Sequence, residues 1–204
     1  YNFDWQARRL FLFPKFTPTV VASNFCATAL MEAYEITREK RFLEIALSAA
    51  HFVINDLHRT EYKDGFLFSY SPLQGNDTVF NASLLGSRLL SFCYKYTGNE
   101  EYCELAEQSI KACCSGQKPN GAWVYGMLPV QSWVDSFHTG YNLDALIAYQ
   151  ELTLKFDNRS HLWELVERKD MEEIHREEIP KFVFRLVDFI SEHKEWQGTA
   201  TELI

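Results

Sequence analysis

The feature that most constrains the fold of this chain is an internal repeat. Residues 20–49 align without a gap on residues 80–109. Identical residues occupy matched positions, namely Ala22 and Ala82, Ser23 and Ser83, Leu30 and Leu90, Tyr34 and Tyr94, Thr37 and Thr97, Glu44 and Glu104, and Ala46 and Ala106. A partial third copy begins near Phe137. Such self-similarity is typical of folds in which each copy forms one supersecondary unit.

Each copy predicts two helices joined by a short turn. Apolar residues recur at helical spacing over residues 20–36, the pattern breaks at 37–40, and a second apolar face follows over 42–53. At the corresponding break of the second copy, Gly98 suits the end of one helix and Asn99 the N-cap of the next. The unit is therefore a helical hairpin.

A long loop after each hairpin also repeats. Asp64-Gly65 and Asn120-Gly121 each predict a tight turn, and alternating aromatic residues after each turn predict a short extended segment. The whole unit spans 56 to 60 residues, which is longer than tetratricopeptide, ankyrin or HEAT units. Because short and long connections alternate, all long loops must lie at one end of the helices. We therefore expect an all-α fold of repeated helical hairpins forming part of an α/α toroid.

Three segments carry a resemblance to a known family. Residues 1–6 (YNFDWQ), 120–126 (NGAWVYG) and 133–141 (WVDSFHTGY) resemble the loops of six-hairpin glycosidase-like (α/α)6 toroids. More narrowly, they resemble uncharacterised bacterial proteins of polysaccharide-biosynthesis loci. The resemblance covers residues 1–155, about two and a half hairpins, so it implies that further hairpins precede residue 1 and that the toroid is truncated there.

The resemblance implies a function in carbohydrate metabolism without fixing the reaction. It implies an oligosaccharide or polysaccharide as partner, and the fold hosts hydrolases, lyases and epimerases. One alternative is a non-catalytic helical scaffold that binds a protein partner. Another is a toroid related to prenyltransferases or terpene cyclases, against which the absence of Asp-rich strings in the sequence counts.

The candidate catalytic residues are Asp135, His138 and Tyr141. We expect the first helix of the third hairpin to begin near Thr139. If the turn before it is helical, the spacing of three residues brings the side chains of Asp135 and His138 within reach of each other. A carboxylate orients an imidazole and favours its protonated form, as proton transfer on a sugar requires. Tyr141 would donate to a sugar hydroxyl or act as an acid. The alternative is that Asp135 caps the helix, His138 bonds a neighbouring loop and Tyr141 packs.

Aromatic residues of the loops are the candidate substrate-binding platforms. Trp123, Tyr125 and Trp133 lie in one long loop, and Tyr70 lies in the equivalent one. Flat rings with polar edges suit the apolar C–H faces of sugars. Packing of these rings between the loops and the helices is the alternative for each of them.

Four polar residues complete the candidate site, two near the start of the second hairpin and two in the first loop. Asp77 is a candidate second catalytic carboxylate, or else a turn residue, and Asn81 a substrate-binding residue. Asp4 and Arg8 are further substrate-binding candidates, Arg8 through a guanidinium pair with a uronate carboxylate. Ordinary surface salt bridges are the alternative for Asp4 and Arg8.

Composition excludes several classes of protein. A net charge of -8 argues against a nucleic-acid partner, and no apolar run approaches the roughly 20 residues of a membrane span. The five cysteines lack metal-site or redox spacing, and no cofactor motif is present. We therefore expect no cofactor, no metal, reduced buried cysteines and a cytoplasmic location.

A change in charge content predicts a boundary. Charged residues make up 19% of residues 1–158 and 39% of residues 159–204. We expect a partial toroid over 1–158 and a charged helical segment over 159–204. That segment is either a divergent helix pair of the same protein or of different origin.

Overall fold

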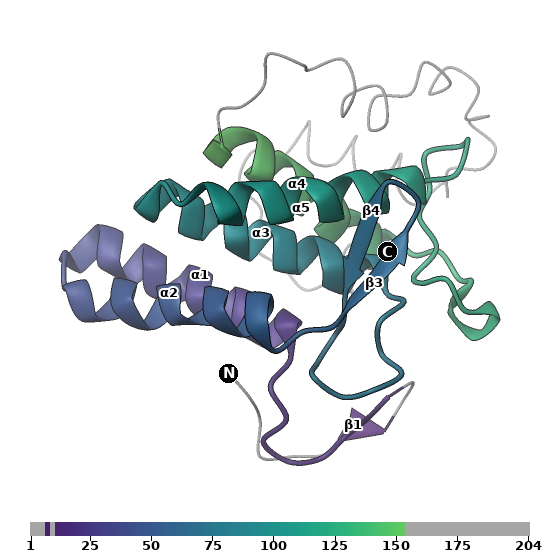
Figure 1. The fold of residues 1–204 in the computed structure, drawn as a ribbon, viewed down its shortest axis with the longest axis horizontal. Coiled ribbons are helices and arrows are strands. Elements are labelled where there is room, and N and C mark those ends of the chain that lie inside the picture. The colour runs from purple at the N-terminus through teal and green to yellow at the C-terminus, as the bar shows by residue number, and fades with distance from the viewer. Residues whose placement is uncertain (1–6, 9–10, 154–204) are drawn as a thin grey trace, which may run out of the picture.

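The computed structural model describes residues 7–8 and 11–153, and this part of the chain is mainly helical (Figure 1). Its α-helices are α1 (Val20–Thr37), α2 (Lys40–Asn55), α3 (Phe80–Thr97), α4 (Glu100–Ser115) and α5 (Ser136–Thr153). The pairs α1–α2 and α3–α4 are the two predicted hairpins, and α5 opens the third. Residues 159–204 and Asp4 lie outside the described residues.

Short strands belong to the connections rather than to the helical layers. Strands β1 (Ala7–Arg8) and β2 (Leu12–Phe13) pair antiparallel, as do β3 (Arg59–Tyr62) and β4 (Gly65–Phe68). The predicted extended segment after Gly65 is thus strand β4. In the equivalent loop before α5, one isolated β-bridge between Val79 and Gly126 stands in place of the predicted extended segment. A 3-10 turn, η1 (Pro129–Gln131), follows in that loop.

Local signals end and begin the helices where the repeat indicated. Helix α3 ends at Gly98, whose φ of 65° is left-handed, and the Asn99 side chain caps α4 by accepting from the Glu101 amide at 3.1 Å. Arg38 ends α1 with the same left-handed geometry, φ 61°, although it is not glycine. Such a backbone is uncommon outside glycine and needs support from its surroundings.

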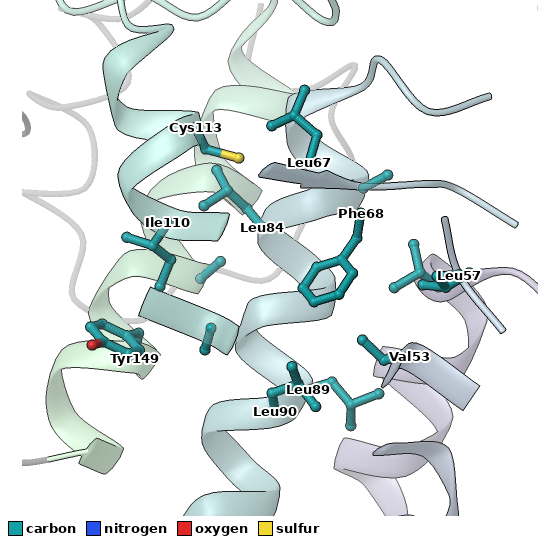
Figure 2. Packing of buried hydrophobic residues seen from close by; sticks show 14 of the residues in the cluster. Val53, Leu57, Leu67, Phe68, Leu84, Leu89, Leu90, Ile110, Cys113 and Tyr149 are labelled. Atoms are coloured by element: carbon teal, nitrogen blue, oxygen red, sulfur yellow. The ribbon is translucent and has the colours of Figure 1, made fainter. Parts of the chain in front are cut away.

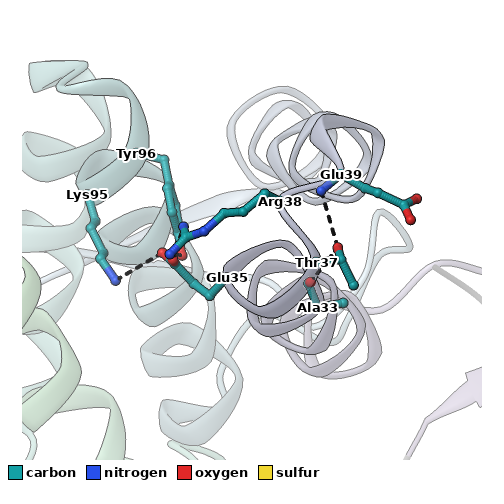
Figure 3. A network of polar contacts seen from close by, with 7 residues as sticks. All are labelled: Ala33, Glu35, Thr37, Arg38, Glu39, Lys95 and Tyr96. Atoms are coloured by element: carbon teal, nitrogen blue, oxygen red, sulfur yellow. Dashed lines mark hydrogen bonds and ion pairs between the residues drawn. The ribbon is translucent and has the colours of Figure 1, made fainter.

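A polar network around Glu35 gives that support (Figure 3). The Glu35 carboxylate accepts from Tyr96 Oη on α3 at 2.8 Å, pairs with Arg38, and lies 3.9 Å from Lys95 Nζ. The hydrogen bond from Tyr96 is the main reason that the pKa of Glu35 lies below its ordinary value. The network therefore ties the turn between α1 and α2 to the neighbouring hairpin.

The helices form two layers with the loops gathered at one end. Helix α3 packs against both α1 and α5, whereas α2 packs chiefly on α1 and α4 on α3. Figure 1 shows the short helix–helix turns at the left and the β3–β4 hairpin with the long loops at the right. This is the arrangement expected of toroid hairpins, with α1, α3 and α5 in one row.

The core lies where the β3–β4 hairpin and α3 meet the neighbouring helices (Figure 2). Phe68 and Leu84 are fully buried, and Gly86 on α3 leaves room for the Phe68 ring, since a Cβ there would come within 3.2 Å of it. Gly65 lies so close to α4 that a Cβ would meet the Gln108 carbonyl oxygen. Close packing therefore fixes the hairpin against the helices.

The start of the third hairpin differs from the prediction. Helix α5 begins at Ser136 rather than near Thr139, because Asp135 binds the first-turn amide of His138 and so extends the helix toward the N-terminus.

Among the described residues, no helix is long and apolar enough to cross a membrane.

Candidate functional site

Asp135 organises the start of α5. Its Oδ1 accepts from the His138 backbone amide at 2.7 Å, which is the hydrogen bond of a helix cap. Its Oδ2 accepts from the Trp133 indole Nε1 at 3.0 Å and lies 2.6 Å from His138 Nδ1. One carboxylate thus both caps the helix and holds an imidazole, so the two interpretations offered by the sequence are compatible.

The electrostatics of this pair favour an ionised carboxylate. Burial raises the pKa of Asp135, but hydrogen bonds from the His138 amide and imidazole and from Trp133 outweigh burial and bring the pKa below its ordinary value. An ionised carboxylate only accepts hydrogen bonds, so the proton lies on His138 Nδ1. His138 Nε2 is then the ring nitrogen left for a ligand.

An aromatic stack lies beside the Asp135–His138 pair. The rings of Tyr125 and Trp133 stack with centroids 4.4 Å apart and planes 13° from parallel. The rings of Tyr125 and His138 make a T-shaped contact with centroids 4.7 Å apart. The Tyr125 amide donates to the Trp133 carbonyl at 2.9 Å, which joins the two arms of the loop. Tyr125 is buried, whereas Trp133 remains 36% exposed. The structure therefore brings four predicted site residues together.

Tyr141 extends the cluster along α5. Its ring contacts the ring of Phe137, one turn earlier, with centroids 4.7 Å apart, and the ring of Phe25 of α1 with centroids 5.3 Å apart. Phe137 and Phe25 are 64% and 40% exposed. Neither phenylalanine is among the predicted site residues, and only the helix periodicity of α5, which places Phe137 four residues before Tyr141, signals one of them.

Two predicted aromatic platforms lie elsewhere. Trp123 is 2% exposed, and its Nε1 donates to the Cys113 carbonyl of α4 at 2.9 Å. Tyr70 stacks on Phe13 with centroids 5.4 Å apart, and burial raises the pKa of its phenol. The packing alternative describes both of these residues.

The remaining polar candidates do not join the cluster through any described contact. Asp77 Oδ2 accepts from Thr60 Oγ1 of β3 at 2.8 Å, a contact that suits a turn residue. Asn81 is 5% exposed in the first turn of α3, and its amide nitrogen has no hydrogen-bond partner among the described residues. Of Arg8, the structure describes only its backbone in β1.

A residue that the sequence did not indicate holds the loop of the site. Gln131 is 1% exposed, and its Oε1 accepts from Thr78 Oγ1 at 2.9 Å and from the Leu128 amide at 3.2 Å. Gly126 fits closely against it, because a Cβ would lie 2.3 Å from that oxygen. A single glutamine in a loop gives no sequence signal, since its partner Thr78 lies in the preceding loop.

The chemistry available at the cluster is that of its own side chains. Within the described part of the chain, no group of three or more His, Cys, Asp and Glu side chains could hold a metal ion. The cluster offers a proton-transfer group at His138, a fixed carboxylate at Asp135 and an exposed ring at Trp133.

Comparison with known proteins gives one informative likeness. No family model matches the chain, and a search of curated proteins finds no match either. Among solved structures, the chain is similar to glycoside hydrolase family 76 (mannosidase) Bt3792 from Bacteroides thetaiotaomicron VPI-5482, with a TM-score of 0.51 and 14% identity. The described residues have the fold of part of an α/α toroid. The match covers 74% of this chain and 42% of the other, so the chain spans less than half of that protein's length. At this identity the likeness concerns the fold alone.

Proposed function

We propose that the chain is part of a carbohydrate-active α/α toroid that holds a sugar at the Trp133 cluster, defined as Tyr125, Trp133, Asp135 and His138. The observation that carries the proposal is the 2.6 Å contact of His138 Nδ1 with Asp135 beside the exposed Trp133 ring. A stacking surface next to a proton-transfer group is what a sugar-processing site requires.

Each residue of the cluster has a chemical role. Trp133 stacks on the C–H face of a sugar, and Tyr125 supports it from behind. Asp135 already accepts three hydrogen bonds, so it positions His138 rather than attacking or protonating the substrate itself. Through Nε2, His138 takes a proton from the sugar or gives one to it. Such chemistry serves hydrolysis, elimination or epimerisation.

Glycoside hydrolysis ordinarily employs two carboxyl groups on either side of the bond. In this chain His138, held by Asp135, is the proton-transfer group on one side, and we propose Asp77 as the carboxyl group on the other, because it lies in the loop before α3 as Asp135 lies before α5. The resemblance of the loops to those of bacterial polysaccharide-biosynthesis proteins supports a substrate that is an oligosaccharide or polysaccharide. The structural neighbour is a mannosidase, which makes mannosides the first sugars to test.

The test is a binding titration measured by isothermal titration calorimetry. Mannosides, uronates and hexosamines are titrated into the full-length protein and into Trp133→Ala, with Phe16→Ala as the matched control because Phe16 is an exposed ring of another loop. We expect Trp133→Ala to weaken binding about threefold to tenfold, the contribution of one stacked ring. Binding that is equal in the wild type and Trp133→Ala would refute the site.

A protein-binding scaffold is the second candidate. Apolar side chains of the same loop are exposed, namely Met127, Leu128, Val130 and Val134 at 37%, 42%, 65% and 47%. Exposed apolar groups that are neighbours in one loop suit a protein interface. In that case no sugar binds in the titration or changes the thermal stability of the protein.

A further inference from the structure

A second polar site lies on α3, farther from the loop end of the helices than the Trp133 cluster. Arg88 Nη1 donates to Thr28 Oγ1 at 3.0 Å and to Asn24 Oδ1 at 3.4 Å, both on α1. Its Nε lies 2.8 Å from Asp144 Oδ2 on α5, and its guanidinium lies 4.8 Å from the Phe92 ring centroid. One side chain of α3 therefore joins the three helices of the row.

Arg88 points away from α4. Ser83, which faces α4 through a 2.7 Å contact with Ser109 Oγ, precedes Arg88 by five residues. At 3.6 residues per turn, Arg88 lies roughly 140° around α3 from Ser83. The site thus belongs to the face of α1, α3 and α5 that α4 does not cover.

In the Arg88–Asp144 pair, the arginine is largely buried and the aspartate is exposed. The Arg88 side chain is 13% exposed and the Asp144 side chain 54% exposed. Their contact is an ion pair that is not aligned as a hydrogen bond, because the buried Nε has no hydrogen-bond partner despite the 2.8 Å distance. A guanidinium edge beside a carboxylate offers donors and an acceptor side by side.

Buried amides on the same three helices also lack partners. Asn24 Nδ2, Asn81 Nδ2 and Asn142 Oδ1 are buried and make no hydrogen bond within the described part of the chain. An unpaired buried polar group costs free energy, so these three amides have hydrogen-bonding capacity that the described residues do not satisfy.

The Trp133 cluster and the Arg88–Asp144 pair each include a residue of α5. Asp144 comes six residues after His138, about 9 Å along the helix axis, and Tyr141 lies midway between them. Gly140 is open, since nothing lies within 4 Å of a Cβ built there. The Tyr141 ring, which contacts the Phe25 ring of α1 with centroids 5.3 Å apart, lies on this stretch of α5. His138 and Asp144 are therefore separated along the helix axis by more than the length of one pyranose ring.

We propose that Arg88 and Asp144 form a second sugar subsite that binds neighbouring hydroxyls of a neutral sugar, so that the substrate is an oligosaccharide lying along α5. Each hydroxyl both donates and accepts, which matches a carboxylate beside a guanidinium. Asp144 disfavours an anionic sugar at this position, and Arg88 disfavours a cationic one. The inference rests on the proposed function of the Trp133 cluster and assigns its substrate length.

The test compares affinity with chain length. Manno-oligosaccharides of one to four residues are titrated into the full-length protein and into Asp144→Asn, which leaves the contacts of Arg88 with Thr28 and Asn24 in place. Glu151→Gln is the matched control, because Glu151 is an exposed carboxylate of the same helix. We expect the affinity of the wild type and of Glu151→Gln to rise with chain length. In Asp144→Asn the gain should fall roughly tenfold while monosaccharide affinity is retained.

The outcomes separate the two proposals. Trp133→Ala should weaken binding at every length, whereas Asp144→Asn should weaken only the longer chains. Equal length dependence in the wild type and Asp144→Asn, with or without a lower Tm, would show that the ion pair only joins helices and would overturn the subsite. Tighter binding of uronate oligomers than of neutral ones would overturn it as well. Absence of binding by any sugar would refute the proposed function and the subsite together.

Discussion

Replacing Asp135 by asparagine tests the centre of the candidate site. The carboxylate accepts from the His138 amide, the His138 imidazole and the Trp133 indole at 2.7, 2.6 and 3.0 Å. Asparagine caps helices as well as aspartate, so its oxygen retains the bond to the His138 amide. Its NH2 group then faces the Trp133 indole, which only donates, so that hydrogen bond is lost, whereas the His138 imidazole shifts its proton to Nε2 and accepts from the NH2 group at Nδ1.

The expected cost follows from the loss of the Trp133 bond. A hydrogen bond to a charged group contributes about 1.5–3 kcal/mol when buried, and solvent screening at a side chain that is 33% exposed reduces it to about 1 kcal/mol. Asp135→Asn should therefore lose about 1 kcal/mol in the free energy of unfolding, a drop in Tm of roughly 2–4 °C for a chain of this size.

The pH dependence gives an independent check. Because the pKa of Asp135 is lower in the folded than in the unfolded protein, its stabilisation is complete above the unfolded pKa of about 3.9 and is lost as the pH falls through the folded value. Calorimetric Tm values of wild type and Asp135→Asn should differ from neutral pH down to about pH 4 and converge as the pH falls further.

The control is Asp64→Asn, in which an exposed aspartate of the β3–β4 turn becomes an Asn-Gly pair that keeps the turn chemistry. We expect its Tm to follow the wild type at every pH. A constant gap between wild type and Asp135→Asn over the whole acidic range, or no gap at neutral pH, would contradict the assigned hydrogen bonds.

Three further predictions concern the surrounding structure. Gly126→Ala places a methyl group 2.3 Å from a side-chain oxygen, so urea unfolding should show a loss of about 1–3 kcal/mol. Trp123→Phe removes the buried indole hydrogen bond to the Cys113 carbonyl and should cost about 1–2 kcal/mol in the same assay without weakening sugar binding. Burial raises the pKa of Cys93 to about 12, so a thiol reagent at pH 8 should label the half-buried Cys26 well before Cys93 in the folded protein.

Local chemistry explains why part of the site was predictable. Asp135 and His138 are three residues apart at a helix start, so their contact depends only on the turn between them. The cap at Asn99 and the left-handed Gly98 are local in the same way. Each of these interactions involves atoms that the chain brings together without any distant segment.

The aromatic residues show where sequence reasoning stops. Trp123 and Trp133 lie ten residues apart in one loop and have the same chemistry, yet one is 2% exposed and the other 36%. The difference arises because α4 offers the Cys113 carbonyl to Trp123, whereas Asp135 and Tyr125 hold Trp133 at the surface. No pattern in the loop itself carries that information.

The sequence by itself determined the repeated hairpins, their caps and the gathering of the long loops at one end, because helical periodicity, capping and the alternation of connection lengths are properties of neighbouring residues. Only the tertiary structure decided which aromatic side chains reach the surface and that Arg88 meets Thr28 and Asp144, respectively 60 and 56 residues away. Those contacts depend on how α1, α3 and α5 pack side by side, and packing between distant helices leaves no periodic signal in any one of them.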